Sequence, residues 1–210
     1  MNINDLAKKL TNRSPSILDS EKFSKYAVLL PLVHIKGEIH VLFEVRSFQL
    51  RRQPGEICFP GGRIDKSDKD AQHTAVRETS EELGISENSI TNISPLDYMI
   101  SPFGTMIFPY VGFIETTDEI RPNPAEVAEV FTVPLSFFKD IKPKVFQVNF
   151  KVEPERDFPF KHIPGGENYN WQARKMEEYF FYYEDKVIWG LTAKILQHFI
   201  EITSDLSLES

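Results

Sequence analysis

The chain has 210 residues, of which 41% are hydrophobic, and its one cysteine is Cys58. This length suffices for one domain with a sizeable core, and a single cysteine excludes an intramolecular disulfide and fits a reducing compartment. The formal net charge of −7 argues against nucleic acid as the main partner. No apolar stretch approaches the ~18 residues that a bilayer requires, and no charged-then-apolar leader opens the chain. We therefore expect a cytoplasmic protein with no membrane partner.

The first third of the chain predicts a short helix followed by two paired strands. Residues 2–10 place apolar side chains at helical spacing, which indicates a short amphipathic helix. Residues 26–35 form a continuous apolar run of strand length. After a turn at 36–37, residues 39–46 alternate between apolar and polar, so the two runs are interpreted as paired strands. The second strand ends at Arg46, next to a glycine-containing loop.

That loop ends in a glycine bend, and a helix follows it. The bend is Phe59–Gly62, and Ser67 or Asp68 is predicted to cap the helix, with Asp70 in its first turn. Gly84 fits the position just past the carboxyl end. The helix is therefore expected to run over about residues 71–83.

Three glutamates lie in the last two turns of this helix. At about 100° per residue, Glu78 and Glu82 share one narrow stripe with two alanines, and Glu81 lies about 80° to one side. The neighbouring flank is apolar or small, which predicts that the helix packs by that flank and displays its acids on the next. The residues of that flank are Val76, Thr79 and Leu83.

Carboxylates at this end of a helix need a cation, because the helix dipole is negative there and side chains at i and i+4 lie about 5–6 Å apart. Arg77 supplies one positive charge four residues before Glu81. Mg²⁺ or Mn²⁺ would suit such an all-oxygen site and would keep waters and phosphate oxygens in its shell. A backbone carbonyl at Gly61 or Gly62 could approach the same ion, since these residues have no side chain. The alternative is a solvated helix face with i,i+4 ion pairs.

Downstream of the helix, residues 97–100 and 106–114 are predicted to be further strands. Glu126 or Glu129 could then reach the metal site or act as a base, and the alternative is that both are solvated. Residues 189–202 form an amphipathic pattern that predicts a closing helix.

The stretch from 144 to 188 is rich in aromatic residues. Strand pairs joined by a turn at Pro164–Gly166 would explain most of these side chains as core. Three residues of the stretch could instead line a ligand pocket: His162, Tyr169 and Trp171.

The glycine bend and the acidic helix together resemble the box of the Nudix hydrolases, Gly-x5-Glu-x7-Arg-Glu-U-x-Glu-Glu-x-Gly-U, where U is a bulky aliphatic residue. The chain departs from it at three points: Asp68 replaces the first Glu, eight residues separate it from Arg77, and Thr79 occupies the first U. These departures fit a narrower resemblance to the coenzyme A diphosphatase branch. Segments 45–62 and 188–193 are similar to that branch, and the likeness runs from about residue 26 to 202.

The resemblance implies a single Nudix domain over residues 1–210, with the box at 61–85, and an α/β/α sandwich around a mixed sheet. Strand and helix alternation alone indicates only an α/β protein. The resemblance also implies metal-dependent hydrolysis of the diphosphate bond of coenzyme A or its thioesters. The ligand pocket considered above would then take adenine or the pantetheine arm. Glu78 and Glu82 would be the firmest metal ligands, with Gly62 and Glu81 beside them. Glu81 and Arg77 are the expected catalytic residues, and the general base stays open among Glu81, Glu126 and Glu129.

Three arginines precede the box: Arg46, Arg51 and Arg52. Clustered guanidinium groups beside a metal site suit a ligand with several phosphates, and coenzyme A carries a diphosphate and a separate 3′-phosphate. Each arginine could instead pair with Glu44 or Glu56. The expected partner is thus a small nucleotide diphosphate, and a homodimer is an open possibility. The alternatives are another nucleoside diphosphate substrate, such as ADP-ribose, or a Nudix-fold module that binds a nucleotide without catalysis.

Overall fold

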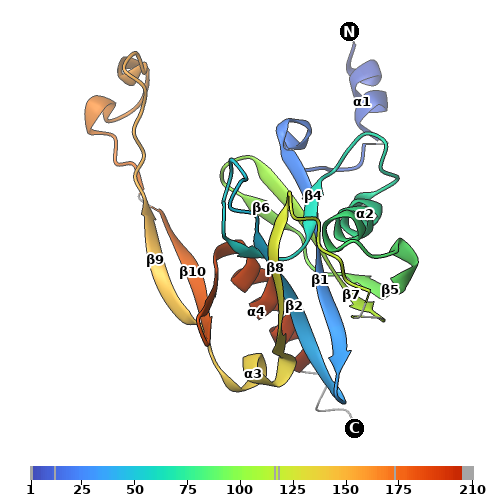
Figure 1. Cartoon of the computed structure of the whole chain (residues 1–210). Coiled ribbons are helices and arrows are strands. Elements are labelled where there is room, and N and C mark those ends of the chain that lie inside the picture. Colours follow the sequence, from blue (N-terminus) through green and yellow to red (C-terminus); the bar gives the residue numbers. More distant parts are fainter. Residues whose placement is uncertain (1, 12, 116, 118, 173, 205–210) are drawn as a thin grey trace.

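The computed structural model describes residues 2–11, 13–115, 117, 119–172 and 174–204 (Figure 1). The α-helices are α1 Ile3–Thr11, α2 Ala71–Leu83, α3 Leu135–Asp140 and α4 Gly190–Ser204. The strands are β1 Ser24–Ile35, β2 Glu38–Arg46, β3 Ile57–Cys58, β4 Gly61–Arg63, β5 Ile90–Pro95, β6 Met99–Ser101, β7 Thr105–Ile114, β8 Val127–Pro134, β9 Lys144–Phe150, β10 Arg174–Tyr183 and β11 Lys186–Trp189. Short 3₁₀ turns cover Ser20–Lys22, Glu87–Ser89, Phe160–His162 and Gly166–Asn168.

Eight strands form one mixed sheet in which β1 is central. β1 is antiparallel to β2 and β4 and parallel to β7, and the main strand order is β3-β2-β1-β7-β5. β8 extends the sheet on β2, and β6 pairs with β7. The predicted pairing of residues 26–35 with 39–46 is therefore confirmed.

Helices α2 and α4 cover opposite faces of this sheet. Ala75 and Leu83 of α2 pack in one cluster with Leu29 of β1, whereas Leu196 of α4 packs in another with Phe43 of β2. Two covered faces explain why β2 is buried on both sides, although its sequence alternates. The α/β/α sandwich is confirmed. None of the helices in the described part of the chain is long and apolar enough to cross a bilayer.

The elements downstream of the box differ in part from the expectation. The strand expected at residues 97–100 lies at Met99–Ser101, and β5 was not predicted. The helix expected at 189–202 is α4, and the short helix expected at 2–10 is α1, which buries none of its described residues and extends away from the body (Figure 1).

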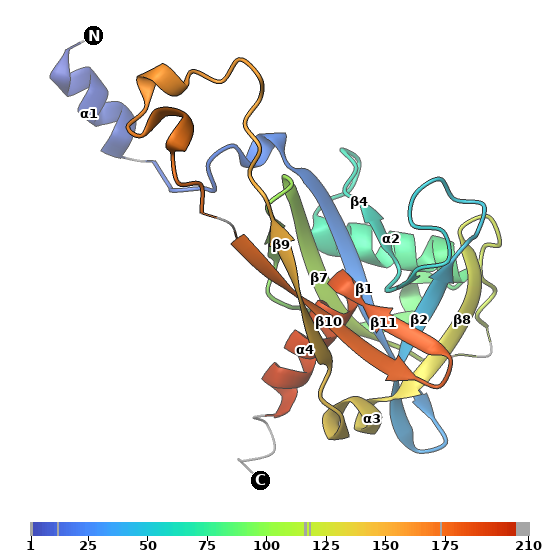
Figure 2. The same cartoon turned by 90° about the vertical axis from the view of Figure 1, so that its left-hand side faces the viewer.

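β9, β10 and β11 form a second, antiparallel sheet. Its β9–β10 hairpin projects from the body, as Figure 2 shows face-on. Phe181 and Ile188 share the core of the main sheet, but Phe146, Tyr169 and Tyr182 are exposed. The interpretation of this aromatic stretch as mostly core is thus wrong for the outward side of the hairpin. That residues 1–210 form one domain stays a prediction.

Candidate metal and diphosphate site

The glycine bend and the end of α2 lie against each other through Glu78 and Glu82. The Gly61 N–H donates to Glu82 Oε2 at 2.8 Å, and the Glu82 side chain is buried. A Cβ at Gly62 would overlap the Glu78 carboxyl group, so only glycine leaves room for that carboxylate. Gly61 lies equally close to the backbone of β1, at Ala27 and Val28. Glycine is therefore required at position 62 by the Glu78 carboxylate and at position 61 by the close approach of β1.

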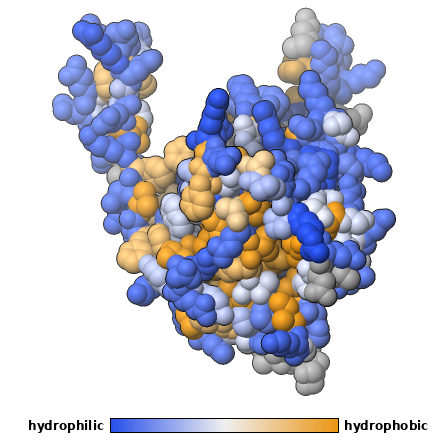
Figure 3. Space-filling view, in the orientation of Figure 1, coloured by the Kyte–Doolittle hydropathy of each residue, from blue (hydrophilic) through white to orange (hydrophobic). Residues whose placement is uncertain are grey.

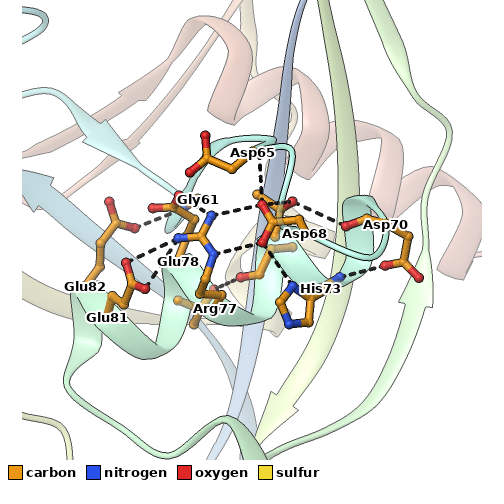
Figure 4. Close-up of polar contacts among 12 residues, drawn as sticks. Gly61, Asp65, Asp68, Asp70, His73, Arg77, Glu78, Glu81 and Glu82 are labelled. Atoms are coloured by element: carbon orange, nitrogen blue, oxygen red, sulfur yellow. Dashed lines mark hydrogen bonds and ion pairs between the residues drawn. The ribbon is translucent and has the colours of Figure 1, made fainter.

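Arg77 connects the acids of the helix to the loop before it (Figure 4). Its Nε and Nη2 donate to the two Asp68 oxygens at 3.0 and 3.1 Å, in bidentate geometry. Nη2 also lies 2.8 Å from Glu78 Oε1, and Nη1 lies 3.3 Å from Glu81 Oε2. The expected contact of Arg77 with Glu81 is present, but its principal partner is Asp68.

Asp68 is a buried anchor and not a helix cap, which corrects the expectation from sequence. Its carboxylate, with 1% of the side chain exposed, also accepts from the Thr74 hydroxyl at 2.9 Å and the Asp65 N–H at 3.0 Å. These donors, with Arg77 first, hold the pKa of Asp68 well below its usual range. The cap is Asp70, and neither Ser67 nor Asp68, because the Asp70 side chain accepts from the His73 N–H at 2.8 Å.

At the other end of α2 the sequence prediction holds. Gly84 adopts a left-handed conformation with φ 64°, and its N–H reaches the Ser80 carbonyl. Glu78, Glu81 and Glu82 are therefore fixed in the final turns of the helix. Glu82 belongs to the buried flank, however, so the prediction that all three acids are displayed is wrong for this residue.

Four carboxylates gather beneath the bend: Glu44, Glu78, Glu82 and Glu126. Burial is the largest cause of the raised pKa of Glu82, and the nearby carboxylate of Glu44 adds to it. The pKa of Glu78 is raised in the same way, chiefly by burial and partly by Glu126, although Arg77 opposes the shift. We call these four residues the acid cluster. It concentrates negative charge in a desolvated place.

Glu44 is the member of the acid cluster that sequence reasoning missed as a site residue. Its side chain is 1% exposed, and Oε1 accepts from the Cys58 thiol at 3.2 Å. Oε2 has no hydrogen-bond partner among the described residues. The available signal was an ionisable residue within the buried run of β2, which is rare unless it is paired or functional. Cys58 packs beside Glu44, and burial raises the pKa of its thiol.

The chemistry of the acid cluster fits a hard divalent cation, because its donors are carboxylate oxygens and one buried oxygen lacks a partner. In the described part of the chain, no three His, Cys, Asp or Glu side chains already converge as a metal cage. A cation there would draw the rest of its shell from water, a backbone carbonyl or substrate oxygens, as Mg²⁺ usually does.

Glu126 and Glu129 have different surroundings. Glu126 belongs to the acid cluster, since its charge raises the pKa values of Glu44, Glu78 and Glu82. Glu129 instead accepts from Lys186 Nζ at 2.8 Å on the partly exposed side of β8. Of the two acids, only Glu126 is in a position to assist chemistry at the cluster.

The three arginines are not in one environment. Arg46 lies at a register shift between β2 and β8, close enough to lower the pKa of Glu44, and its Nε is buried without a partner among the described residues. Arg51 and Arg52 are exposed on the loop of residues 47–56. Arg46 therefore interacts with Glu44 through its charge. Arg51 and Arg52 are accessible to a ligand.

The aromatic residues considered for an adenine or pantetheine pocket lie elsewhere. Tyr169 and Trp171 meet edge to face, with 4.9 Å between ring centroids, in the tip of the β9–β10 hairpin, and His162 is in the same segment. Figure 1 shows this tip on the opposite side of the molecule from α2. The structure does not bring these residues to the acid cluster.

Residues 24–155 match the NUDIX domain family. This chain belongs to the Nudix family. The Enterococcus faecalis MutT/nudix family protein has the same fold, with a TM-score of 0.52 at 15% identity over 97% of this chain and 70% of the other.

The resemblance to the coenzyme A diphosphatase branch is also confirmed. Over 143 residues the chain is 40% identical to the peroxisomal coenzyme A diphosphatase NUDT7 of Mus musculus, which covers 68% of this chain and 58% of the mouse protein. It is 38% identical over 113 residues to the mitochondrial coenzyme A diphosphatase NUDT8 of Homo sapiens, covering 52% and 48%. An uncharacterized Nudix hydrolase, NudL of Photorhabdus laumondii, is 32% identical over 81% of this chain and 80% of its own length. The match to this chain spans little more than half the length of the mouse protein.

Proposed function

We propose that this chain is a hydrolase of the diphosphate bond of coenzyme A or its thioesters, and that it works with Mg²⁺ or Mn²⁺ in the cytoplasm. The products would be 4′-phosphopantetheine, free or acylated, and adenosine 3′,5′-bisphosphate. Membership of the Nudix family and the 40% identity to a coenzyme A diphosphatase support the substrate class. The observation that carries the chemistry is the acid cluster packed on a side-chain-free bend.

Glu78 and Glu82 are the proposed principal metal ligands, and the Gly62 carbonyl and Glu81 are proposed beside them. Glu82 Oε2 already accepts a hydrogen bond from the Gly61 N–H, so Oε1 is the oxygen proposed to contact an ion. A bound dication would neutralise diphosphate oxygens and lower the pKa of a water for attack on phosphorus. The role of the acids in this scheme is to hold the ion and orient the water.

Glu81 and Glu126 are the proposed candidates for the general base. Glu81 is half exposed and held at the edge of the site by Arg77, which leaves it room to accept a proton from water. Glu126 is partly buried within the acid cluster. Arg77 orients Glu81 and Glu78 from a position that Asp68 fixes.

Arg46, Arg51 and Arg52 are the proposed contacts for substrate phosphates. Arg51 and Arg52 are exposed, so a ligand could contact them without disturbing the packing of the protein. Two guanidinium groups on a loop can take a 3′-phosphate, while Arg46 lies nearer the carboxylates.

Initial rates with coenzyme A and with ADP-ribose, each with Mg²⁺ and with Mn²⁺, test the proposal. We expect a clear preference for coenzyme A, whereas a preference for ADP-ribose would reject the substrate assignment. Glu82→Gln should reduce kcat by orders of magnitude with an unchanged circular dichroism spectrum. Glu129→Gln is the matched control, because this acid is paired with Lys186 outside the acid cluster. Normal turnover by Glu82→Gln would place the metal elsewhere.

A further inference from the structure

The second sheet has an outward face made of large apolar side chains. In the antiparallel register of β9, β10 and β11, Phe180 is opposite Lys144 on one side and Trp189 on the other, and Tyr182 is opposite Val187. Side chains of a sheet alternate between faces, so these positions share one face. We call this the outer face, and its large apolar members include Phe146, Val148, Phe180, Tyr182, Val187 and Trp189, while Glu178 lies opposite Phe146 on the same face.

Most of the outer face is open to solvent, although its residues are large. The exposed fraction is 51% for Phe146, 46% for Tyr182 and 41% for Trp189. The opposite face of the same sheet carries Phe181 and Ile188, which are buried in the core with α4. Figure 2 shows the three strands face-on with no other element in front of them.

The rings of the outer face are organised and not scattered. Phe180 stacks on Trp189 at 5.6 Å between centroids and meets Phe146 edge-on at 5.3 Å. Lys144 Nζ lies 5.0 Å above the Tyr182 ring. Contiguous apolar surfaces that stay exposed on a folded protein often mark an interaction site. In Figure 3 the apolar colour gathers at the base of the hairpin and the centre of the body, and the tip of the hairpin is mostly hydrophilic.

The charge of this region identifies a second copy of the same chain as the partner. Residues 142–186 contain eight Lys or Arg and eight Asp or Glu, so the segment is neutral, and the whole charge of −7 lies in the rest of the chain. Two copies of an acidic protein repel each other through most of their surface. A two-fold interface places one surface against itself, so a surface with little net charge avoids repulsion between the two copies. The outer face itself carries two positive residues, Lys144 and Arg174, and one negative residue, Glu178, so little of the negative charge of the chain lies on it.

We propose that two copies of the chain associate through the outer face, with the β9–β10–β11 sheets packed face to face. Sheets that pack in this way interdigitate at about 10 Å, which would bury Phe146 and Trp189 against their counterparts. The projection of the hairpin away from the body leaves the face unobstructed for a partner (Figures 1 and 2).

Light scattering coupled to size-exclusion chromatography of the full chain, from about 1 to 100 μM, tests the proposal. We expect a species of twice 24.3 kDa for the wild type at the upper concentrations. Phe146→Glu should shift the mass to 24.3 kDa throughout, with an unchanged circular dichroism spectrum and coenzyme A hydrolysis as evidence of folding. Val145→Glu is the matched control, because Val145 is 45% exposed on the adjacent position of the same strand but on the other face. It should leave the dimer intact.

Trp189 provides a second measurement. In a Trp171→Phe background its fluorescence should shift to shorter wavelength as concentration rises, and Phe146→Glu should abolish that shift. A wild type that stays monomeric at 100 μM would overturn the proposal. Equal dissociation by Val145→Glu and Phe146→Glu would also overturn it, since the effect would then not belong to the outer face.

Discussion

Replacing Glu44 by glutamine tests whether the acid cluster destabilises the protein when no cation is bound. Glu44 is buried in β2 with one oxygen unpartnered, and burial raises its pKa to about 7 from the ordinary 4.5. The folded chain therefore binds this proton more tightly than the unfolded chain. Its free energy of unfolding must fall as pH rises above 4.5 and level off above about 7.

The magnitude follows from the two pKa values. At pH 8 the buried charge costs about 3 kcal/mol, and at pH 5 less than about 1 kcal/mol. Glutamine keeps the shape and an acceptor for Cys58, but it adds donors that cost about 1 kcal/mol if they stay unpaired. We expect Glu44→Gln to be about 1–2 kcal/mol more stable than the wild type at pH 8 and no more stable at pH 5.

Urea unfolding in EDTA at pH 5 and pH 8, followed by circular dichroism, measures both differences. Glu129→Gln is the control, because its ion pair with Lys186 is partly exposed and such pairs contribute at most about 1 kcal/mol. Added Mn²⁺ should recover part of the wild-type deficit at pH 8. The reasoning is refuted if Glu44→Gln is less stable than the wild type at pH 8, or if its advantage does not change between the two pH values.

Three further substitutions examine the bend, its anchor and the phosphate contacts. Gly62→Ala should lower kcat by about 100-fold with little change in Tm, because the Glu78 carboxylate must move away from the bend; kinetics at the wild-type level would contradict this. Asp68→Asn should reduce the free energy of unfolding in urea by about 2–3 kcal/mol, since Arg77 loses a bidentate, buried partner, and a loss below about 0.5 kcal/mol would show that the pair is dispensable. Arg51→Ala should raise KM for coenzyme A about 10-fold without an equal rise for 3′-dephospho-coenzyme A, and an equal rise in steady-state assays of both would deny it a contact with the 3′-phosphate.

The end of α2 was predictable because its determinants are local. Helical periodicity places Glu78 and Glu82 on one stripe, and a glycine just past Leu83 supplies the left-handed turn. The start of the helix was not predictable in the same way. Asp68 and Asp70 are equally plausible caps by residue type, and the choice depends on the distant contact that draws Asp68 to Arg77.

Glu44 was missed as a site residue for a related reason. Its neighbours in the acid cluster come from α2 and from the loop before β8, and strand periodicity carries no information on what packs above a strand. The aromatic stretch misled in the opposite direction, since rings such as Phe146 and Tyr182 are typical of a core. Composition cannot tell a core from a surface that awaits a partner.

The positive charge at the site is unevenly distributed, and this bears on how the site works. Arg77 contacts Asp68, Glu78 and Glu81. Glu82 accepts a hydrogen bond from the Gly61 N–H, and its pKa is raised by burial and by Glu44. A protein that needed these acids only for packing would gain stability by losing them, because their desolvation opposes folding. The uncompensated side of the acid cluster therefore supports the proposal of a cation at this site, and the stability gained by Glu44→Gln in EDTA would measure what such a cation must offset.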